Sequence, residues 1–145
     1  MDHEFKIKDL GRLNYFLGLE VLHTDSGLFL GQSKYAHDIV SFVGLLDSKL
    51  VSTPLSSATP LVLDGRSYDN PNHYWSLVGA LQYLTITRTD IAYMVNQVIQ
   101  FLKAPSIAHF QAVKILIHYI KGTLSFGLTF TRPTSTNLVG NSDTN

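Results

Sequence analysis

Acidic side chains that could hold divalent metals are scattered along this sequence of 145 residues. Two-metal phosphoryl transfer needs carboxylates that converge within a few ångströms. No two of the eleven acidic residues are adjacent, and only Asp2 and Glu4 stand two positions apart. A glycine-rich phosphate loop and the motifs G-x-S-x-G, S-x-x-K and H-E-x-x-H are also missing from the sequence. The residue pattern therefore argues against a complete polymerase or hydrolase site.

Histidine and cysteine indicate no metal site either. His109 and His118 are nine residues apart in a segment with helical spacing, which places them roughly 180° apart around a helix axis. Side chains on opposite sides of one helix cannot bind the same metal ion. The sequence contains no cysteine, which excludes disulfides, thiolate catalysis and cysteine zinc sites.

Composition narrows the class of protein. Hydrophobic residues make up 45% of the chain and charged residues 15%, which is typical of a folded domain. Eleven basic residues balance eleven acidic ones, so the chain lacks the basic excess of a freestanding nucleic-acid-binding module. No apolar run approaches the roughly 20 residues that span a bilayer, and the first nine residues carry charges where a signal peptide would be apolar. We therefore predict an intracellular protein, cytoplasmic or nuclear, with no membrane partner.

Residues 15–32 have the pattern of a β-hairpin. The sequence Thr24-Asp25-Ser26-Gly27 lies between two apolar runs and carries turn-forming residue types. In the first run Tyr15, Leu17, Leu19 and Val21 would share one face of a strand, and Gly18 would mark a bulge or a close approach of another backbone. An isolated hairpin is marginally stable in water, so we expect this one to dock on further structure.

Helical spacing dominates the rest of the chain. A short helix is predicted after the hairpin, with Ser33 as its cap and Gly44 near its end, and 50–72 reads as a proline-rich connector. Three amphipathic helices would then form a bundle, the last beginning at Ser106 and ending at Gly122. A strand over 126–130 and a turn toward Leu138 follow. The residues predicted to be buried in the helices are Tyr35, Ile39, Phe42 and Val43, then Tyr74, Leu77, Val78, Leu81 and Leu84, then Ile91, Met94, Val95, Val98, Ile99 and Leu102, and finally Ile107, Phe110, Val113, Ile117 and Ile120.

Longer motifs follow one another in a definite order along the chain. They are FKIKDLGRLNYFLGLEV, GLFLGQSKYAHDIV, the TPL at 53–55, YWSLVGALQYLTITRTDIAYMVNQVIQFL, AVKILIHYIKGT and the final NSD. In this order they resemble the later part of the reverse transcriptase of copia-type LTR retrotransposons, which is encoded within the Pol polyprotein. The resemblance covers nearly the whole chain, and several ordered motifs at similar intervals are far more specific than one short pattern.

The resemblance implies a position inside a larger enzyme, an RNA-directed DNA polymerase with an RNase H domain. In that family the catalytic palm, with its Tyr-x-Asp-Asp turn, lies upstream of KDLG, and RNase H starts near the downstream Ser-Asp. The chain would begin after the polymerase carboxylates, so the palm and the RNase H segments would be its missing partners. Asp143 matches the first RNase H carboxylate and is the one catalytic and metal candidate. Mg²⁺ serves the parent enzyme, but Asp143 alone would bind it weakly, so no cofactor is expected for this chain.

Four parts follow from the patterns and the resemblance together. They make an α+β fold that is an incomplete part of a reverse transcriptase. The parts are a palm-end, primer-grip-like hairpin and helix over 1–49, a connector over 50–72, a thumb-like or connection-like helical bundle over 73–123, and strands over 124–145 that form a carboxy-terminal hairpin leading into a truncated RNase H domain.

The amino-terminal hairpin resembles the primer grip in its placement, between palm and thumb. This resemblance implies that Leu17, Gly18 and Leu19 contact the primer of an RNA or DNA primer–template, with Gly18 allowing a phosphate or sugar to approach the backbone. It also implies that the palm supplies the hairpin's partner. The alternative interpretation is that the hairpin covers a core and touches no ligand.

The last predicted helix carries a polar face opposite its apolar stripe. Gln111, Lys114, His118 and Lys121 recur at three-four spacing, so a phosphate backbone could follow them. A solvated helix face is the alternative. Between two helices, Arg88 is expected to neutralise a helix carboxyl end rather than bind nucleic acid, and Gly79 is expected to allow close helix packing.

Several positions depart from the family pattern. Trp75 stands where the family usually has Arg, Thr89 where it has Pro, and His118 where an Arg usually precedes the tyrosine. The changes at Trp75 and His118 reduce charge that could meet nucleic acid, the change at Thr89 removes a rigid residue, and together they fit a decayed element copy. Two functions remain: a non-catalytic part of a reverse transcriptase that contacts primer–template, and a protein-interaction module retained by a host, without a nucleic-acid role.

Overall fold

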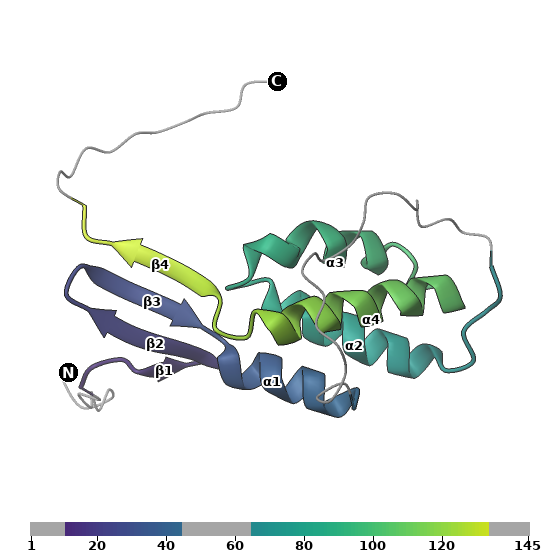
Figure 1. Ribbon diagram of the computed structural model, residues 1–145, viewed down its shortest axis with the longest axis horizontal. Helices are drawn as coiled ribbons and strands as arrows, with labels where there is room; N and C mark the ends of the chain where they lie inside the picture. Colours follow the sequence, from purple (N-terminus) through teal and green to yellow (C-terminus); the bar gives the residue numbers. More distant parts are fainter. Residues whose placement is uncertain (1–10, 45–64, 134–145) are drawn as a thin grey trace, which may run out of the picture.

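A computed structural model describes residues 11–44 and 65–133, which form an antiparallel sheet at one end and a helical bundle at the other (Figure 1). This arrangement confirms the predicted α+β class. The sheet has the order β1-β2-β3-β4. The strands are β1 (Tyr15–Phe16), β2 (Leu19–Thr24), β3 (Gly27–Gly31) and β4 (Gly127–Thr131), and the helices are α1 (Ser33–Phe42), α2 (Pro71–Leu84), the 3₁₀ turn η1 (Thr89–Ile91), α3 (Ala92–Ile99) and α4 (Ile107–Gly122).

The predicted first strand is in fact two strands. Tyr15 pairs with Glu20 and Phe16 pairs with Leu19, so Leu17 and Gly18 form a two-residue turn. Both turn residues have positive φ, 49° at Leu17 and 80° at Gly18, as a type I′ hairpin turn requires. The shared face predicted for Tyr15, Leu17, Leu19 and Val21 is therefore wrong, and Gly18 marks a turn instead of a bulge. Leucine rarely adopts positive φ, so no local signal indicated this turn.

The turn predicted over 24–27 is confirmed. Thr24 pairs with Gly27, which leaves Asp25 and Ser26 as a tight turn between β2 and β3. The hairpin then pairs with β4, where Leu30 lies opposite Leu128. The chain itself therefore supplies one partner strand for the hairpin, and a contact with the palm stays a prediction. The second strand of the predicted carboxy-terminal hairpin, near Leu138, lies outside the described residues.

On one face of this sheet the ring of Phe29 covers two glycines, Gly31 and Gly127. A Cβ atom added at Gly127 would lie 2.7 Å from the Phe29 ring, and one added at Gly31 would lie 3.0 Å from it. The Phe29 ring therefore lies over the two glycines, which are themselves paired across β3 and β4. Aromatic cover of this kind buries apolar surface where the glycines have no side chain to do so.

Helix α1 joins the helices of the second half in one core. Ala36, Ile39 and Val40 are buried in the same cluster as the apolar residues of α2, α3 and α4. The bundle therefore includes α1 in addition to the three predicted helices. Phe42 was predicted to be buried, yet its side chain is 65% exposed, because α1 turns Ala36 and Val40 inward instead. The division of the chain into four parts stays a prediction.

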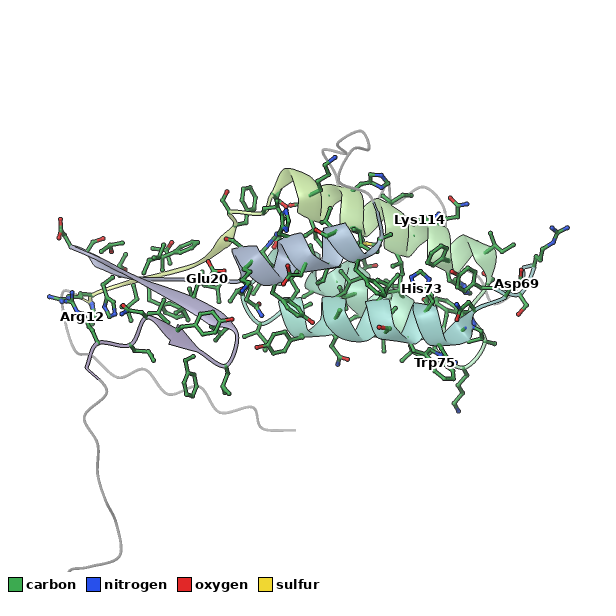
Figure 2. The ribbon with its side chains drawn as sticks, turned by 90° about the horizontal axis from the view of Figure 1, so that it is seen from below. Arg12, Glu20, Asp69, His73, Trp75 and Lys114 are labelled. Carbon is green, nitrogen blue, oxygen red and sulfur yellow. The ribbon has the colours of Figure 1, made fainter. Side chains whose placement is uncertain are left out.

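The start of α1 is held by a side chain from the sheet. The predicted cap, Ser33, is already the first helical residue, and Gln32 occupies the cap position without a side-chain cap bond. The Glu20 carboxylate instead accepts a hydrogen bond from the Lys34 backbone N–H at 2.9 Å. A carboxylate at this position also complements the positive end of the helix dipole. Figure 2 shows Glu20 at this junction.

The later helices confirm most of the predicted core. Tyr74, Leu77, Val78, Leu81 and Leu84 of α2 are all buried, as are Ile91, Val95, Val98, Phe110, Val113, Ile117 and Ile120. The predicted burial of Ile107 is wrong, because this residue lies in the first turn of α4 and its side chain is 37% exposed. The buried Tyr74 hydroxyl donates to the Val98 carbonyl at 2.8 Å, and burial raises the pKa of Tyr74 to about 12.

The starts of α2 and α4 follow local capping chemistry. The Asn70 side chain accepts a hydrogen bond from the His73 N–H, and Ser106 forms a capping box with His109, as the predicted cap at Ser106 requires. The predicted end of α4 at Gly122 is confirmed, and Thr123 forms the C-cap. No helix in the described ranges is long and apolar enough to cross a membrane.

Candidate nucleic-acid interface

The turn between β1 and β2 contains the three residues expected to meet a primer. Leu17 is 73% exposed, while Gly18 and Leu19 are half-buried. The Tyr83 hydroxyl of α2 donates a hydrogen bond to the Leu17 carbonyl. A Cβ atom at Gly18 would lie 2.6 Å from the same hydroxyl. The close approach that Gly18 allows is therefore that of Tyr83, and the sequence signal for it was the glycine alone.

Tyr83 is itself held in place by a second aromatic residue. The rings of Tyr35 and Tyr83 meet edge to face, with centroids 5.0 Å apart. Burial, and then the neighbouring Tyr83, raise the pKa of Tyr35. Tyr83 of α2 thus contacts the exposed β1–β2 turn, and Tyr35 of α1 packs against Tyr83. These contacts hold Leu17 in place at the surface.

The polar face of α4 is present as predicted, and Lys114 and His118 on it have contacts within the chain. Gln111 is exposed, and Lys114, His118 and Lys121 are half-buried. The Lys114 Nζ lies 4.9 Å from the centroid of the Phe110 ring. His118 Nδ1 donates a hydrogen bond to the Lys114 carbonyl at 2.8 Å. This face lies on a different element from the β1–β2 turn, and Figure 2 shows Lys114 on it.

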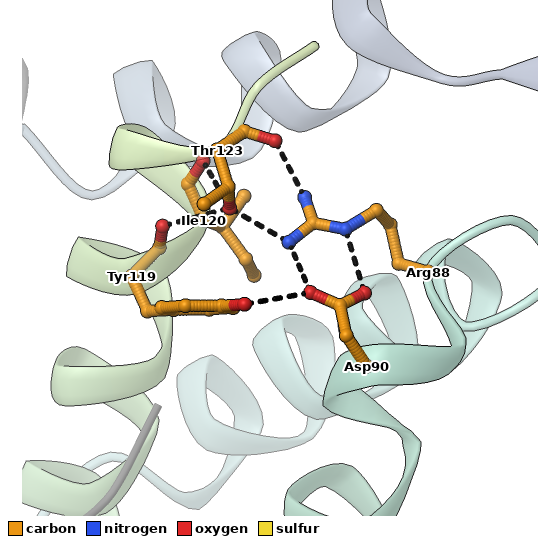
Figure 3. A network of polar contacts seen from close by, with 5 residues as sticks. All are labelled: Arg88, Asp90, Tyr119, Ile120 and Thr123. Carbon is orange, nitrogen blue, oxygen red and sulfur yellow. Dashed lines mark hydrogen bonds and ion pairs between the residues drawn. The ribbon is translucent and has the colours of Figure 1, made fainter. Parts of the chain in front are cut away.

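Arg88 is buried in a polar network at the end of α4 (Figure 3). Its guanidinium donates to both carboxylate oxygens of Asp90, at 2.9 and 2.7 Å. It also donates to the Thr123 carbonyl at 2.9 Å and to the Thr123 hydroxyl at 2.7 Å. Since Thr123 is the C-cap of α4, the prediction that Arg88 neutralises a helix carboxyl end is confirmed. A guanidinium that is only 1% exposed does not bind nucleic acid.

Asp90 completes this network. Burial alone would raise the pKa of the Asp90 carboxyl, but the hydrogen bonds and charge of Arg88, with the Tyr119 hydroxyl, outweigh burial and lower that pKa. Tyr119 donates to Asp90 at 2.9 Å, and burial followed by this bond raises the Tyr119 pKa. The network joins the start of η1 to the end of α4, so its role is structural.

The structure also places three further residues that the sequence analysis discussed. His109 is fully buried, and its Nδ1 accepts a hydrogen bond from the Ser106 backbone N–H at 3.0 Å. Trp75, which stands where the family usually has Arg, donates from Nε1 to the Leu102 carbonyl at 2.6 Å. Gly79 is exposed and a Cβ there would meet nothing within 4 Å, so the expected close helix packing is wrong.

Metal ligands are not gathered in the part of the chain that the structure describes. No group of three or more His, Cys, Asp or Glu residues in these ranges could hold a metal ion. Asp143, the predicted RNase H carboxylate, lies outside the described residues. The predicted contact residues that the structure does describe lie on the β1–β2 turn and on the polar face of α4.

Known proteins resemble the chain along most of its length. It is 35% identical over 144 residues to the retrovirus-related Pol polyprotein from transposon RE1 of Arabidopsis thaliana, which covers 99% of the chain and 10% of that polyprotein. The Pol polyprotein from transposon TNT 1-94 of Nicotiana tabacum is 32% identical over 140 residues, covering 90% of the chain and 10% of that protein. The mitochondrial protein AtMg00810 of Arabidopsis thaliana is 46% identical over 124 residues, which are 86% of the chain.

The chain spans 52% of AtMg00810 and a much smaller share of each Pol polyprotein. No protein-family model matches the chain, and no solved structure matches it. The similarity to Pol polyproteins from several transposons confirms the resemblance that the ordered motifs indicated. The chain belongs to the copia-type retrotransposon Pol polyproteins, and it corresponds to 10% of the length of the polyprotein from RE1.

Proposed function

We propose that this chain is the part of a copia-type reverse transcriptase that follows the catalytic palm and holds the primer–template, and that it has no polymerase or RNase H activity alone. The observation that carries this proposal is the β1–β2 turn, in which Leu17 is 73% exposed on a turn tied to α2 through Tyr83. Because contacts within the chain already hold this turn, binding a strand would cost little additional conformational entropy.

Apolar and aromatic side chains surround the tip of this turn. Tyr15 is 61% exposed and Phe16 is 54% exposed, next to Leu17. Aromatic and aliphatic groups contact sugars and base faces without reading sequence, which suits a polymerase that must hold any primer. The turn would therefore position a strand end and give no base preference.

The polar face of α4 would supply the electrostatic part of duplex binding. Lys114, His118 and Lys121 lie along one helix face, so each can meet a different phosphate. Three contacts release few counterions, so the logarithm of affinity should fall with that of salt at about −0.9 per phosphate contact.

Catalysis would remain with the missing parts of the parent enzyme. Phosphoryl transfer requires two metal ions held by converging carboxylates, and the eleven acidic residues of this sequence include no adjacent pair. Asp143 would belong to the RNase H metal site of the parent enzyme, where Mg²⁺ neutralises charge on the scissile phosphate. A single carboxylate leaves most of the octahedral Mg²⁺ shell to water, so Asp143 alone would bind the ion weakly.

Primer extension, RNA–DNA hybrid cleavage and duplex binding together test this proposal. With Mg²⁺ or Mn²⁺ the chain should neither extend a primer nor cleave a hybrid, and it should bind a primer–template duplex more weakly at the higher of two salt concentrations. Lys114→Ala with Lys121→Ala, and separately Leu17→Ala, should weaken duplex binding. Lys34→Ala, at an exposed lysine of α1, is the matched control. Templated extension in preparations free of contaminating polymerase would refute the proposal, and so would equal binding by all variants.

A protein-interaction module is the second candidate, favoured by a groove on α2. The groove has a volume of about 350 Å³ and is lined by Trp75, Val78, Gly79, Gln82, Leu102 and Lys103. Its lining is mostly apolar, as protein-binding surfaces often are. If this candidate holds, the chain should bind no duplex at low salt, and the flanking reading frame should encode neither palm nor RNase H carboxylates.

A further inference from the structure

We propose that the end of the sheet farthest from the bundle binds one nucleotide of an unpaired nucleic-acid strand, with its phosphate between Arg12 and Arg132 and its base on Phe130. The inference rests on the proposed function for its class of ligand, but it uses a surface that shares no residue with the β1–β2 turn or the α4 face. Figure 2 shows Arg12 at this end of the sheet.

The floor of the site is one row of residues across three strands. His23 of β2 lies opposite Leu28 of β3, and Leu28 lies opposite Phe130 of β4, so all three share one face of the sheet. Phe130 is 51% exposed and Leu28 is 36% exposed. With the neighbouring residues they line a hollow of about 340 Å³, within the size range of small-ligand sites.

Backbone hydrogen bonds bring Arg12 to one side of this hollow. His23 Nε2 donates to the Leu13 carbonyl at 2.7 Å. The Val21 N–H donates to the Asn14 carbonyl at 2.9 Å. These two bonds hold the segment before β1 against β2, so Arg12 lines the hollow although it precedes the first strand.

Arg132 reaches the hollow from the opposite side. Its backbone N–H donates to the Ser26 carbonyl at 2.8 Å, which extends the β3–β4 pairing as far as the β2–β3 turn. Within the described ranges neither Arg12 nor Arg132 forms a salt bridge, since Arg88 and Asp90 make the ion pair there. Among the residues that the structure describes, no acidic side chain lines the hollow, and Asp25 lies in the adjoining turn. Two guanidinium groups at one hollow, neither paired with an acidic side chain of the described ranges, favour a phosphate.

The exposed ring of Phe130 favours binding of an unpaired strand over binding of a duplex. Bases in a duplex are stacked on each other and hide their faces, whereas an unpaired base can stack on an aromatic side chain. A polar acidic peptide would satisfy the arginines but would leave Phe130 and Leu28 without an apolar partner. Cations around an exposed aromatic floor are the usual elements of single-strand binding.

Binding of a labelled oligothymidine of ten nucleotides to the full chain, measured by fluorescence anisotropy, tests the inference. Arg12→Ala and Arg132→Ala should each weaken binding about threefold to tenfold, and the two changes together should make the salt dependence shallower by about 0.7, because the arginines share one phosphate. Phe130→Ala should weaken it at least about fivefold, and Phe130→Trp should keep binding near that of the unmodified chain. The matched controls are Arg66→Ala and Tyr93→Ala, at an exposed arginine and an exposed tyrosine of the bundle half of the molecule.

Further variants separate this inference from the proposed function. Lys114→Ala with Lys121→Ala should weaken duplex binding and leave oligothymidine binding unchanged, while Asp25→Asn should strengthen oligothymidine binding about twofold. If the duplex is not bound but the arginine variants lose oligothymidine, the proposed function fails and this inference stands. Equal losses in Arg12→Ala and Arg66→Ala would overturn it, as would a lack of oligothymidine binding. Stronger competition by polyglutamate than by unlabelled oligothymidine would also overturn it, in favour of an acidic peptide.

Discussion

The Tyr83 hydroxyl donates a hydrogen bond to the Leu17 carbonyl, 66 residues earlier in the chain. This bond ties the β1–β2 turn to helix α2, and the same hydroxyl lies so close to Gly18 that a side chain there would clash with it. Local turn geometry and a long-range bond therefore act on the same two residues. The turn that we propose as a strand contact depends on both.

Replacing Tyr83 with Phe should loosen this turn. The Leu17 carbonyl is at the surface and can bond to water, so we expect a loss of about 0.5–1.5 kcal/mol in the free energy of unfolding. Amide hydrogen exchange at Gly18 and Leu19 should accelerate more than exchange in α4. Tyr93→Phe, at a tyrosine that is 71% exposed, is the control and should change neither quantity. Unchanged exchange at Gly18 would show that the hydroxyl does not hold the turn.

Replacing Arg88 with Met should destabilise the bundle. The change leaves the Asp90 carboxylate without its cation and the Thr123 carbonyl at the end of α4 without a donor. Breaking a fully buried pair costs about 3–5 kcal/mol. Because Asp90 is 32% exposed, we expect about 2–3 kcal/mol by chemical denaturation. A double-mutant cycle with Asp90→Asn should show coupling above about 0.5 kcal/mol. Additive effects would contradict the network in Figure 3.

Acid should weaken the fold through Asp90. Its pKa in the folded chain lies below the ordinary value of 3.8, so its contribution to stability is complete above that value. As the pH falls below 3.8 and through the lower folded pKa, the folded chain must take up the proton and the contribution disappears. Urea unfolding at pH 7 and pH 3 should therefore show a smaller loss of stability for Asp90→Asn than for the unmodified chain. An equal loss would mean that other carboxylates cause the acid sensitivity.

Two glycines should respond in opposite directions to substitution by alanine. Gly79 is exposed inside α2 and a Cβ there meets nothing, so Gly79→Ala should stabilise the chain by about 1 kcal/mol. Gly18 has a φ of 80°, and a Cβ would lie 2.6 Å from the Tyr83 hydroxyl, so Gly18→Ala should lower the melting temperature. The pair can be compared in one thermal denaturation series. A gain at Gly18 or a loss at Gly79 would contradict the structure.

The sequence by itself determined the features that depend on neighbouring residues. Apolar spacing predicted the buried faces of α2, α3 and α4, and turn or cap chemistry predicted the tight turn before Gly27 and the cap at Ser106. Each of these features arises within a few residues, where backbone preferences and side-chain spacing act directly. The ordered motifs also indicated the Pol polyprotein family.

Only the tertiary structure decided which distant residues meet. It placed Tyr83 against Gly18, Thr123 against Arg88, β4 beside β3, and Arg12 and Arg132 around one hollow. It also overrode a local preference, because Leu17 takes the positive φ that the hairpin turn needs. These pairings join segments far apart in the sequence, and no periodicity or short motif records them, since they depend on how whole helices and strands pack.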